Sequence, residues 1–238
     1  RTVHVVRAAR GAYNMHGSLL PKYRGRVPTN WAVLNGETET GATLHEMAEK
    51  PDAGAILAQT PVPILPDDTA AQVFEKTTVA AEQTLWRALP ALIAGEASHL
   101  PNDLTKGSYF GGRKPEDGRI DWSQTAQQVY NLIRAVAPPY PGAFADIGQA
   151  RFIVARARLV PENGLPDISA ESLREVSNLP PGLHVKDNAL FGVCGDGRVV
   201  AIRELRQPFV DESQTPAGGE YVVSPAEFGR LTQSLPHS

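Results

Sequence analysis

The residues best suited to chemistry are Asn14 and His16, a carboxamide and an imidazole two positions apart. If residues 12–16 form a strand, both side chains point to the same side, because side chains alternate along a strand. A carboxamide N–H can donate to a developing negative charge, and an imidazole can transfer a proton near neutral pH. Turn formers within residues 17–21 predict that the pair lies at the end of the strand. In α/β folds, ligands bind at such ends of parallel strands.

Three cations follow the pair within five positions, namely Lys22, Arg24 and Arg26. Guanidinium and ammonium groups at this spacing favour an anionic ligand. Exposed charges are common on any protein, so a solvated surface is the alternative for each of them. An isolated Asn-x-His is likewise typical of an ordinary surface turn, and its assignment therefore needs a second motif.

Two motifs, residues 14–26 and 50–56, resemble those of the folate-dependent formyltransferase family. The first reads Asn-Met-His-Gly-Ser-Leu-Leu-Pro-Lys-Tyr-Arg-Gly-Arg and the second reads Lys-Pro-Asp-Ala-Gly-Ala-Ile. The second motif places Asp52 at the family's distance from His16, which is 36 residues (52 − 16 = 36). The resemblance continues through residues 119–122 to about Phe144. Together the motifs predict a formyltransferase.

The resemblance implies a role for each motif residue. Asn14 stabilises the transition state, His16 is the proton donor, and Asp52 orients the histidine and favours its protonated form. The resemblance also makes Arg26 a folate contact and residues 48–52 a folate-binding loop. That loop consists of Ala48, Glu49, Lys50, Pro51 and Asp52. No covalent enzyme intermediate and no metal is implied.

The implied donor is 10-formyltetrahydrofolate, a co-substrate, and the implied acceptor is the amine of a nucleotide-linked amino sugar. Gly17 and the Tyr23–Arg26 context are most similar to family members that act on UDP-4-amino-4-deoxy-L-arabinose, in lipid A modification and polymyxin resistance. We expect cations on loops to hold the diphosphate of that acceptor, in a pocket at a domain junction. The candidates are Lys22, Arg24, Arg113, Lys114 and Arg119, with ordinary surface charges as the alternative.

Two other functions stay open at this point. Methionyl-tRNA formyltransferase shares the catalytic motif, but a tRNA-binding protein is expected to be basic, and this chain carries a net charge of −3. Nucleic acid is therefore not an expected partner. The alternative from another class is a non-catalytic folate-binding or nucleotide-binding fragment. By the family's layout, roughly the first third of a formyltransferase would precede residue 1, so we expect the chain alone to bind formylfolate weakly.

Composition points to a soluble, cytoplasmic protein. The chain contains no run of 18 apolar residues, so no membrane insertion is expected. Its single cysteine, Cys194, cannot form an internal disulfide, which is consistent with a reducing compartment. We expect that cysteine to be a small buried hydrophobe. The sequence does not define the oligomeric state.

The predicted fold class is α/β, a Rossmann-like formyltransferase domain followed by an open-barrel, OB-like subdomain. The expected boundaries are 1–105 for the C-terminal part of the catalytic domain, 106–118 for a linker and 119–238 for the barrel-like domain. Alternation predicts strands at 38–47 and 54–64. Asp67 to Ala94 is predicted to be a helix that Asp68 or Thr69 can cap and that buries Val73, Leu85, Leu89, Leu92 and Ile93. Residues 100–116 are expected to be irregular chain.

Further along the chain, we expect a strand at 119–122, a helix at 124–137, and a hairpin that turns at Gly148. Residues 3–6 are expected to form a strand and residues 162–181 a mobile loop. His45 is expected to be structural or exposed. Trp31, Trp86 and Trp122 are expected in the core.

Overall fold

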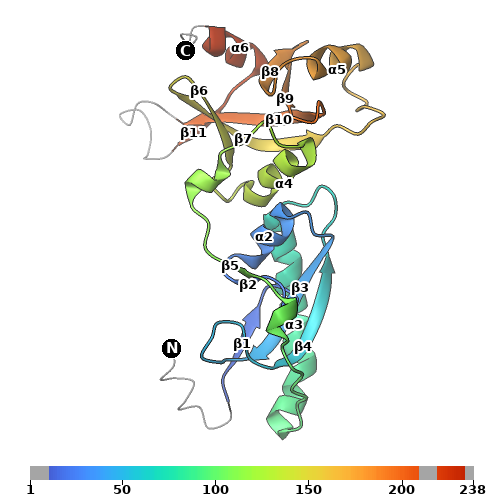
Figure 1. The fold of residues 1–238 in the computed structure, drawn as a ribbon, viewed down its shortest axis with the longest axis vertical. Helices are drawn as coiled ribbons and strands as arrows, with labels where there is room; N and C mark the ends of the chain where they lie inside the picture. Colours follow the sequence, from blue (N-terminus) through green and yellow to red (C-terminus); the bar gives the residue numbers. More distant parts are fainter. Residues whose placement is uncertain (1–10, 209–218, 234–238) are drawn as a thin grey trace. The chain divides into compact units, whose positions relative to one another are not determined.

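In the computed structural model, residues 11–208 and 219–233 are described, and the strand expected at residues 3–6 lies outside them. The chain divides into two compact units, Arg1–Arg113 and Lys114–Ser238. The division falls inside the segment 106–118 that the sequence suggests as a linker. Each unit has its own sheet, and the elements of both are labelled in Figure 1.

Unit 1 is built on a three-stranded sheet in the order β1-β3-β4. β1 (Tyr13–His16) pairs antiparallel with β3 (Glu39–Glu46), which pairs antiparallel with β4 (Ile56–Pro63). Among the described residues, the motif strand β1 therefore pairs with an antiparallel neighbour. From the sequence, we expected Asn14 and His16 to lie at the end of a parallel strand. Asn14 and His16 nevertheless lie at the C-terminal end of β1, because the turn begins directly after His16.

In the described part of unit 1, two helices accompany this sheet. The short α2 (Pro28–Leu34) begins with a proline, whose fixed φ suits the first helical position. The long α3 (Ala70–Ala94) packs on β3 and β4. Thr69 caps α3 by accepting from the N–H of Gln72, and Gly95 ends it with a φ of 76°.

The predicted buried face of α3 is partly wrong. The buried residues are smaller and lie on a neighbouring face: Ala70, Val73, Thr77, Ala80 and Thr84. Leu85, Leu89 and Ile93 are 44%, 41% and 66% exposed, and Trp86, expected in the core, is 80% exposed. A helix of 25 residues is about 38 Å long and a strand of eight residues about 26 Å, so the last turns of α3 extend beyond the strands it covers (Figure 1).

A second, small sheet follows α3 in the chain. The 3₁₀ turn η1 (Leu104–Lys106) leads into β5 (Tyr109–Phe110), which pairs in parallel with β2 (Arg24–Gly25). Leu100 also forms a bridge with Ile56 at the start of β4. The segment after the helix is thus hydrogen-bonded to the first unit, where the sequence suggested irregular chain.

Unit 2 is built on an antiparallel sheet in the order β6-β7-β10-β9-β8, with β11 paired to β10. The strands are β6 (Ala143–Ile147), β7 (Ala150–Leu159), β8 (Gly182–Lys186), β9 (Ala189–Val193), β10 (Val199–Pro208) and β11 (Glu220–Val222). Register shifts between β10 and β7 near Glu204 mark a bulge, which increases strand twist and bends the sheet. The predicted hairpin at Gly148 is confirmed.

The described residues of unit 2 also form three helices and one 3₁₀ turn: η2 (Pro115–Gly118), α4 (Ala126–Val136), α5 (Ala170–Ser177) and α6 (Pro225–Gln233). Two predictions are wrong here. Residues 119–122 form only an isolated bridge, from Arg119 to Phe144. Residues 162–181 contain α5, because Ser169 caps the helix and Val176 joins the apolar core formed with Phe191 and Val199. No helix in the described ranges is long and apolar enough to cross a membrane.

Candidate active site

His16 ends β1 with both ring nitrogens facing acceptors. Its Nε2 lies 2.8 Å from the carbonyl oxygen of Tyr23, and its side chain is buried, with 6% of the residue exposed. Because a carbonyl oxygen only accepts, Nε2 carries a hydrogen and donates it. Nδ1 lies 3.6 Å from Oδ1 of Asp52. The site therefore accommodates an imidazolium, with one acceptor at each nitrogen.

The turn after β1 holds the Tyr23 carbonyl in place. Ser18 Oγ donates to the carbonyl of Lys22 at 2.7 Å, and Thr43 Oγ1 donates to the carbonyl of Ser18 at 2.6 Å. Tyr23 itself adopts a φ of 56°, and its phenol donates to Glu37. These contacts explain why the small, polar Ser18 is fully buried directly after the motif.

Asp52 is the centre of the cluster. Its Oδ1 is 3.6 Å from His16 Nδ1 and 3.5 Å from His45 Nε2, and its Oδ2 accepts from the backbone N–H of Gly25 at 2.8 Å. Burial raises the pKa of Asp52, but the hydrogen bonds from His45 and Gly25 and the charge on His16 outweigh burial. The pKa of Asp52 therefore lies below its usual 3.8, and the carboxylate is ionised at neutral pH.

His45 belongs to this cluster, although the sequence suggested a structural or exposed residue. It is 1% exposed and lies directly opposite Asn14 in the β1–β3 register. Its Nδ1 donates to the carbonyl of Glu46 at 2.7 Å. In the neutral ring, Nε2 then accepts from Asn14 Nδ2 at 3.2 Å, whereas a protonated ring donates to Asp52. His45 thus orients the Asn14 amide. Burial along β3 does not alternate, since residues 40–45 are all buried, so the strand pattern alone did not single out His45.

Four of the predicted ligand-binding cations lie in unit 1: Lys22, Arg24, Arg26 and Arg113. Lys22 and Arg26 are exposed, while Arg24 is half-buried and lies 6.0 Å from the ring of Tyr109. Arg24 Nε is buried and has no hydrogen-bond partner among the described residues. Arg113 lies over the ring of Trp31 at 4.9 Å.

The remaining two predicted acceptor residues, Lys114 and Arg119, lie in unit 2. Lys114 is exposed, and its N–H donates to Asp117. Arg119 pairs with Asp146 at 2.7 Å and lies 5.1 Å from the ring of Phe144. The guanidinium of Arg119 therefore already has an acidic partner within its own unit.

Residues 48–51, expected to bind folate, form an exposed turn that leads into Asp52. Asp52 adopts a φ of 51°, so the chain reverses at this residue. Asn102 Nδ2 supports the reversal by donating to the carbonyls of Asp52 and Gly54, at 3.0 and 3.1 Å. Asn102 therefore anchors the backbone on both sides of Ala53, while the Asp52 carboxylate is held separately by the N–H of Gly25.

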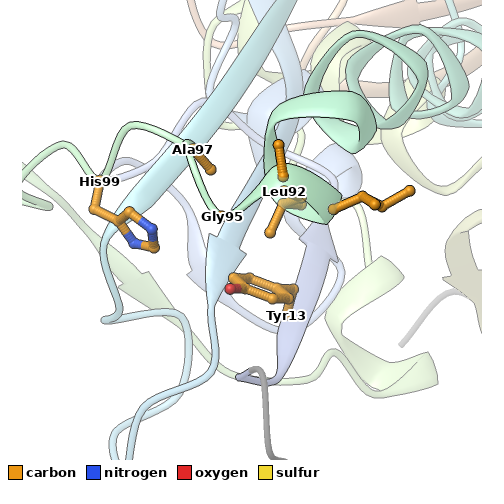
Figure 2. A pocket seen from close by; sticks show the side chains of 7 residues that line it. Tyr13, Leu92, Gly95, Ala97 and His99 are labelled. Carbon is orange, nitrogen blue, oxygen red and sulfur yellow. The ribbon is translucent and has the colours of Figure 1, made fainter.

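A separate pocket of about 460 Å³ lies where α3 ends, beside the start of β1 (Figure 2). Leu92 and the ring of Tyr13 face it, together with His99, whose Nδ1 is 3.0 Å from a carboxylate oxygen of Glu46. Neither Asn14, His16 nor Asp52 lines this pocket. It is therefore distinct from the cluster around Asp52.

The other candidate side chains carry no comparable chemistry. Burial raises the pKa of Cys194 to about 12, so its thiol is protonated at neutral pH, as expected for a small buried hydrophobe. Within the described ranges, no group of three or more His, Cys, Asp or Glu side chains is arranged to hold a metal ion.

Family models match both units of the chain. Residues 2–89 match the model described as "Formyl transferase" and residues 113–212 the model described as "Formyl transferase, C-terminal domain". The chain belongs to the formyl transferase family. The predicted fold class, an α/β formyltransferase domain followed by a C-terminal domain, is thereby confirmed.

Solved structures with this fold include an N-formyltransferase from Helicobacter canadensis in complex with folinic acid and dTDP-3-aminofucose. It is 22% identical, with a TM-score of 0.62 over 80% of this chain and 65% of that one. WlaRD, a sugar 3N-formyl transferase with dTDP and 5-N-formyl-THF, is 23% identical, with a TM-score of 0.61 over 80% and 64%. HypX from Aquifex aeolicus with tetrahydrofolic acid is 20% identical, with a TM-score of 0.62 over 96% and 36%. The chain thus spans less than two thirds of the length of these proteins.

Proposed function

We propose that this chain transfers a formyl group from 10-formyltetrahydrofolate to the amine of a nucleotide-linked amino sugar. The convergence of Asn14, His16 and Asp52 supports this proposal most directly, because these three side chains come from two distant motifs. The membership of the formyl transferase family supports the reaction class. The sugar N-formyltransferases with the same fold support the acceptor class.

Each side chain has a role that its contacts suit. The Asn14 amide, oriented by His45, donates to the formyl oxygen as that oxygen gains negative charge. The amine forms a bond to the formyl carbon as the bond from that carbon to the folate nitrogen breaks. The His16 imidazolium, held between the Tyr23 carbonyl and Asp52, supplies a proton to the departing folate nitrogen and, once neutral, takes up the proton that the amine releases. Asp52 stays ionised and stabilises the positive charge on His16. Formylfolate contributes only the transferred group, and Arg26 with residues 48–52 is the proposed contact surface for it.

The proposed acceptor is UDP-4-amino-4-deoxy-L-arabinose, the substrate of the family members with the most similar motif, which would place the chain in lipid A modification. Lys22, Arg24 and Arg113 are the proposed partners of its diphosphate. The buried Arg24 Nε without a partner in the described residues supports this assignment, because a buried N–H is expected to have an acceptor. Lys114 and Arg119 are weaker candidates, since Arg119 already pairs with Asp146.

A formyl-transfer assay with three acceptors tests the proposal. We expect formylation of UDP-4-amino-4-deoxy-L-arabinose, slower formylation of a dTDP-amino sugar, and none of methionyl-tRNA. Preferential formylation of methionyl-tRNA would identify the alternative tRNA enzyme. Stoichiometric folate binding without transfer to any acceptor would identify a non-catalytic folate-binding fragment.

Arg24→Ala is expected to raise the KM for the nucleotide sugar and to leave the KM for formylfolate unchanged. A lost charge-assisted hydrogen bond costs about 1.5–3 kcal/mol, which corresponds to a KM increase of roughly 10-fold to 100-fold. Arg24→Lys should restore only part of the affinity, because an ammonium lacks the bidentate geometry. Arg198→Ala, an exposed arginine in unit 2, is the matched control. An unchanged acceptor KM in Arg24→Ala would rule out this phosphate contact.

A further inference from the structure

The segment that follows α3, residues 100–113, touches both loops that carry the candidate active site. We call it the brace segment. At one end, Leu100 bridges Ile56, and Asn102 donates to the carbonyls of Asp52 and Gly54. At the other end, β5 pairs with β2. The sequence suggested only irregular chain leading to a linker here.

The pairing of β5 with β2 fixes the backbone of the loop after the first motif. Ser108 accepts from Arg24 N at 2.9 Å through its carbonyl and from Tyr23 N at 2.9 Å through its hydroxyl. The Phe110 carbonyl accepts from Arg26 N at 3.0 Å. Gly25, between these residues, has a φ of 101°, and any Cβ there would collide with the Phe110 carbonyl oxygen. The two strands therefore approach as closely as their backbones allow.

A stack of rings locks this pairing. Phe110 lies between Tyr23 and Trp31, with ring centroids 5.2 and 4.8 Å away and interplanar angles of 13° and 25°. The guanidinium of Arg113 covers Trp31 at 4.9 Å, and the indole N–H of Trp31 donates to the Gly111 carbonyl at 3.0 Å. Tyr23 is itself anchored through its phenol to Glu37 and Asn35. Movement of Phe110 must therefore disturb Tyr23.

The backbone held in this way supplies two of the hydrogen bonds that define the catalytic geometry. The carbonyl of Tyr23 accepts from His16 Nε2, and the N–H of Gly25 donates to Asp52 Oδ2. The His16–Asp52 distance of 3.6 Å thus depends on the position of residues 23–25. The side chain of Asn102 fixes Asp52 from the other side, because it donates to the backbone carbonyl of Asp52.

We propose that the brace segment is a positioning element of the active site, in which Asn102 and Phe110 hold Asp52 and His16 in register. Neither residue touches the reacting groups, since Asn102 acts through the Asp52 backbone and Phe110 through Tyr23 and Gly25. The proposal rests on the proposed formyl transfer for its kinetic consequence and on the described contacts for its geometry. The brace segment thus contributes to catalysis in addition to linking α3 to unit 2 along the chain.

The test compares Phe110→Ala, Phe110→Leu and Asn102→Ala with Phe110→Tyr, which keeps a ring in the stack. Lys106→Ala is the matched control, because Lys106 lies in the same segment with its side chain 79% exposed. Two quantities are measured on folded protein: kcat and KM for both substrates, and the pKa of the Asp52 carboxyl by ¹³C NMR titration. Circular dichroism and the thermal midpoint establish folding.

We expect the alanine variants to lose about 10-fold to 100-fold in kcat with KM changes below about threefold, because small misplacements of catalytic groups cost rate rather than affinity. The pKa of Asp52 should rise in them, because the donor at Gly25 or the anchor at Asn102 moves while burial remains. Phe110→Leu should give intermediate values of kcat and of the Asp52 pKa. Phe110→Tyr and Lys106→Ala should match the wild type in both.

A purely structural role would lower the thermal midpoint without changing kcat per folded molecule or the pKa of Asp52, and that result would overturn the proposal. If Phe110→Ala does not fold, Phe110→Leu and Asn102→Ala decide in its place. If the wild-type chain transfers no formyl group, the proposed function fails. The Asp52 titration in the same variants still decides whether the brace segment positions the carboxylate.

Discussion

His16→Ala is expected to reduce kcat for formyl transfer by about 10²-fold to 10⁴-fold, the usual effect of removing a proton-transfer group. The His16 imidazole can both hold and release a proton near neutral pH, whereas His45, the other imidazole of the cluster, contacts Asn14 and the Glu46 carbonyl. The His16 ring is held by the Tyr23 carbonyl and by Asp52, so neither the backbone nor a neighbouring side chain can replace it. Steady-state kinetics with both substrates measures the loss.

The buried ring of His16 also fills space, and its removal can lower stability. His16→Gln is therefore the second variant, because an amide preserves most of the volume and can still donate to Tyr23. It should fold and be as inactive as the alanine variant. His184→Ala is the matched control, since His184 lies in unit 2, where its Nε2 is 2.7 Å from the Pro180 carbonyl oxygen. Turnover within about threefold of wild type in folded His16→Gln would exclude a catalytic role of the kind that proton transfer requires.

The sequence was informative about the site where the signal was local. Asn14 and His16 share a strand face, and Asp52 lies at a motif spacing, so residue types and separations suffice to nominate them. The structure brings all three together. His45 was not nominated, because its role depends on the register that sets it opposite Asn14. Gly25 contributes a backbone N–H, which leaves no side-chain signal at all.

The fold, like the site, was predictable where the signal lies within a few residues and not where it depends on distant partners. The cap of α3 at Thr69 and the hairpin at Gly148 are encoded within a few residues, and both were predicted. The buried face of α3 was not, because Ala80 and Thr84 are buried by strands that are distant in the sequence, while larger residues extend beyond them. The antiparallel pairing of β1 and the isolated bridge of Arg119 also depend on non-local partners. The hydrogen bonds of the brace segment likewise depend on partners that are distant in the sequence.

Asp52→Asn is the second change with a large expected effect, a reduction of kcat by about 10²-fold to 10³-fold. The asparagine oxygen can still accept from Gly25, so the loop keeps its anchor while the negative charge beside His16 disappears. The loss therefore reports electrostatic stabilisation of the imidazolium. Asp121→Asn is the matched control, because Asp121 is an exposed carboxylate in unit 2 whose pKa is also lowered.

The pH dependence of stability provides an independent check on Asp52. Its folded pKa is depressed, so its ionised form stabilises the fold at every pH above the ordinary carboxyl value, and this contribution is lost as pH falls through the folded pKa. The difference in unfolding free energy between the wild type and Asp52→Asn should therefore shrink as the pH falls below the ordinary carboxyl value of about 4. A difference that persists unchanged into strong acid would mean that the neutral side chain, rather than its charge, holds the cluster together.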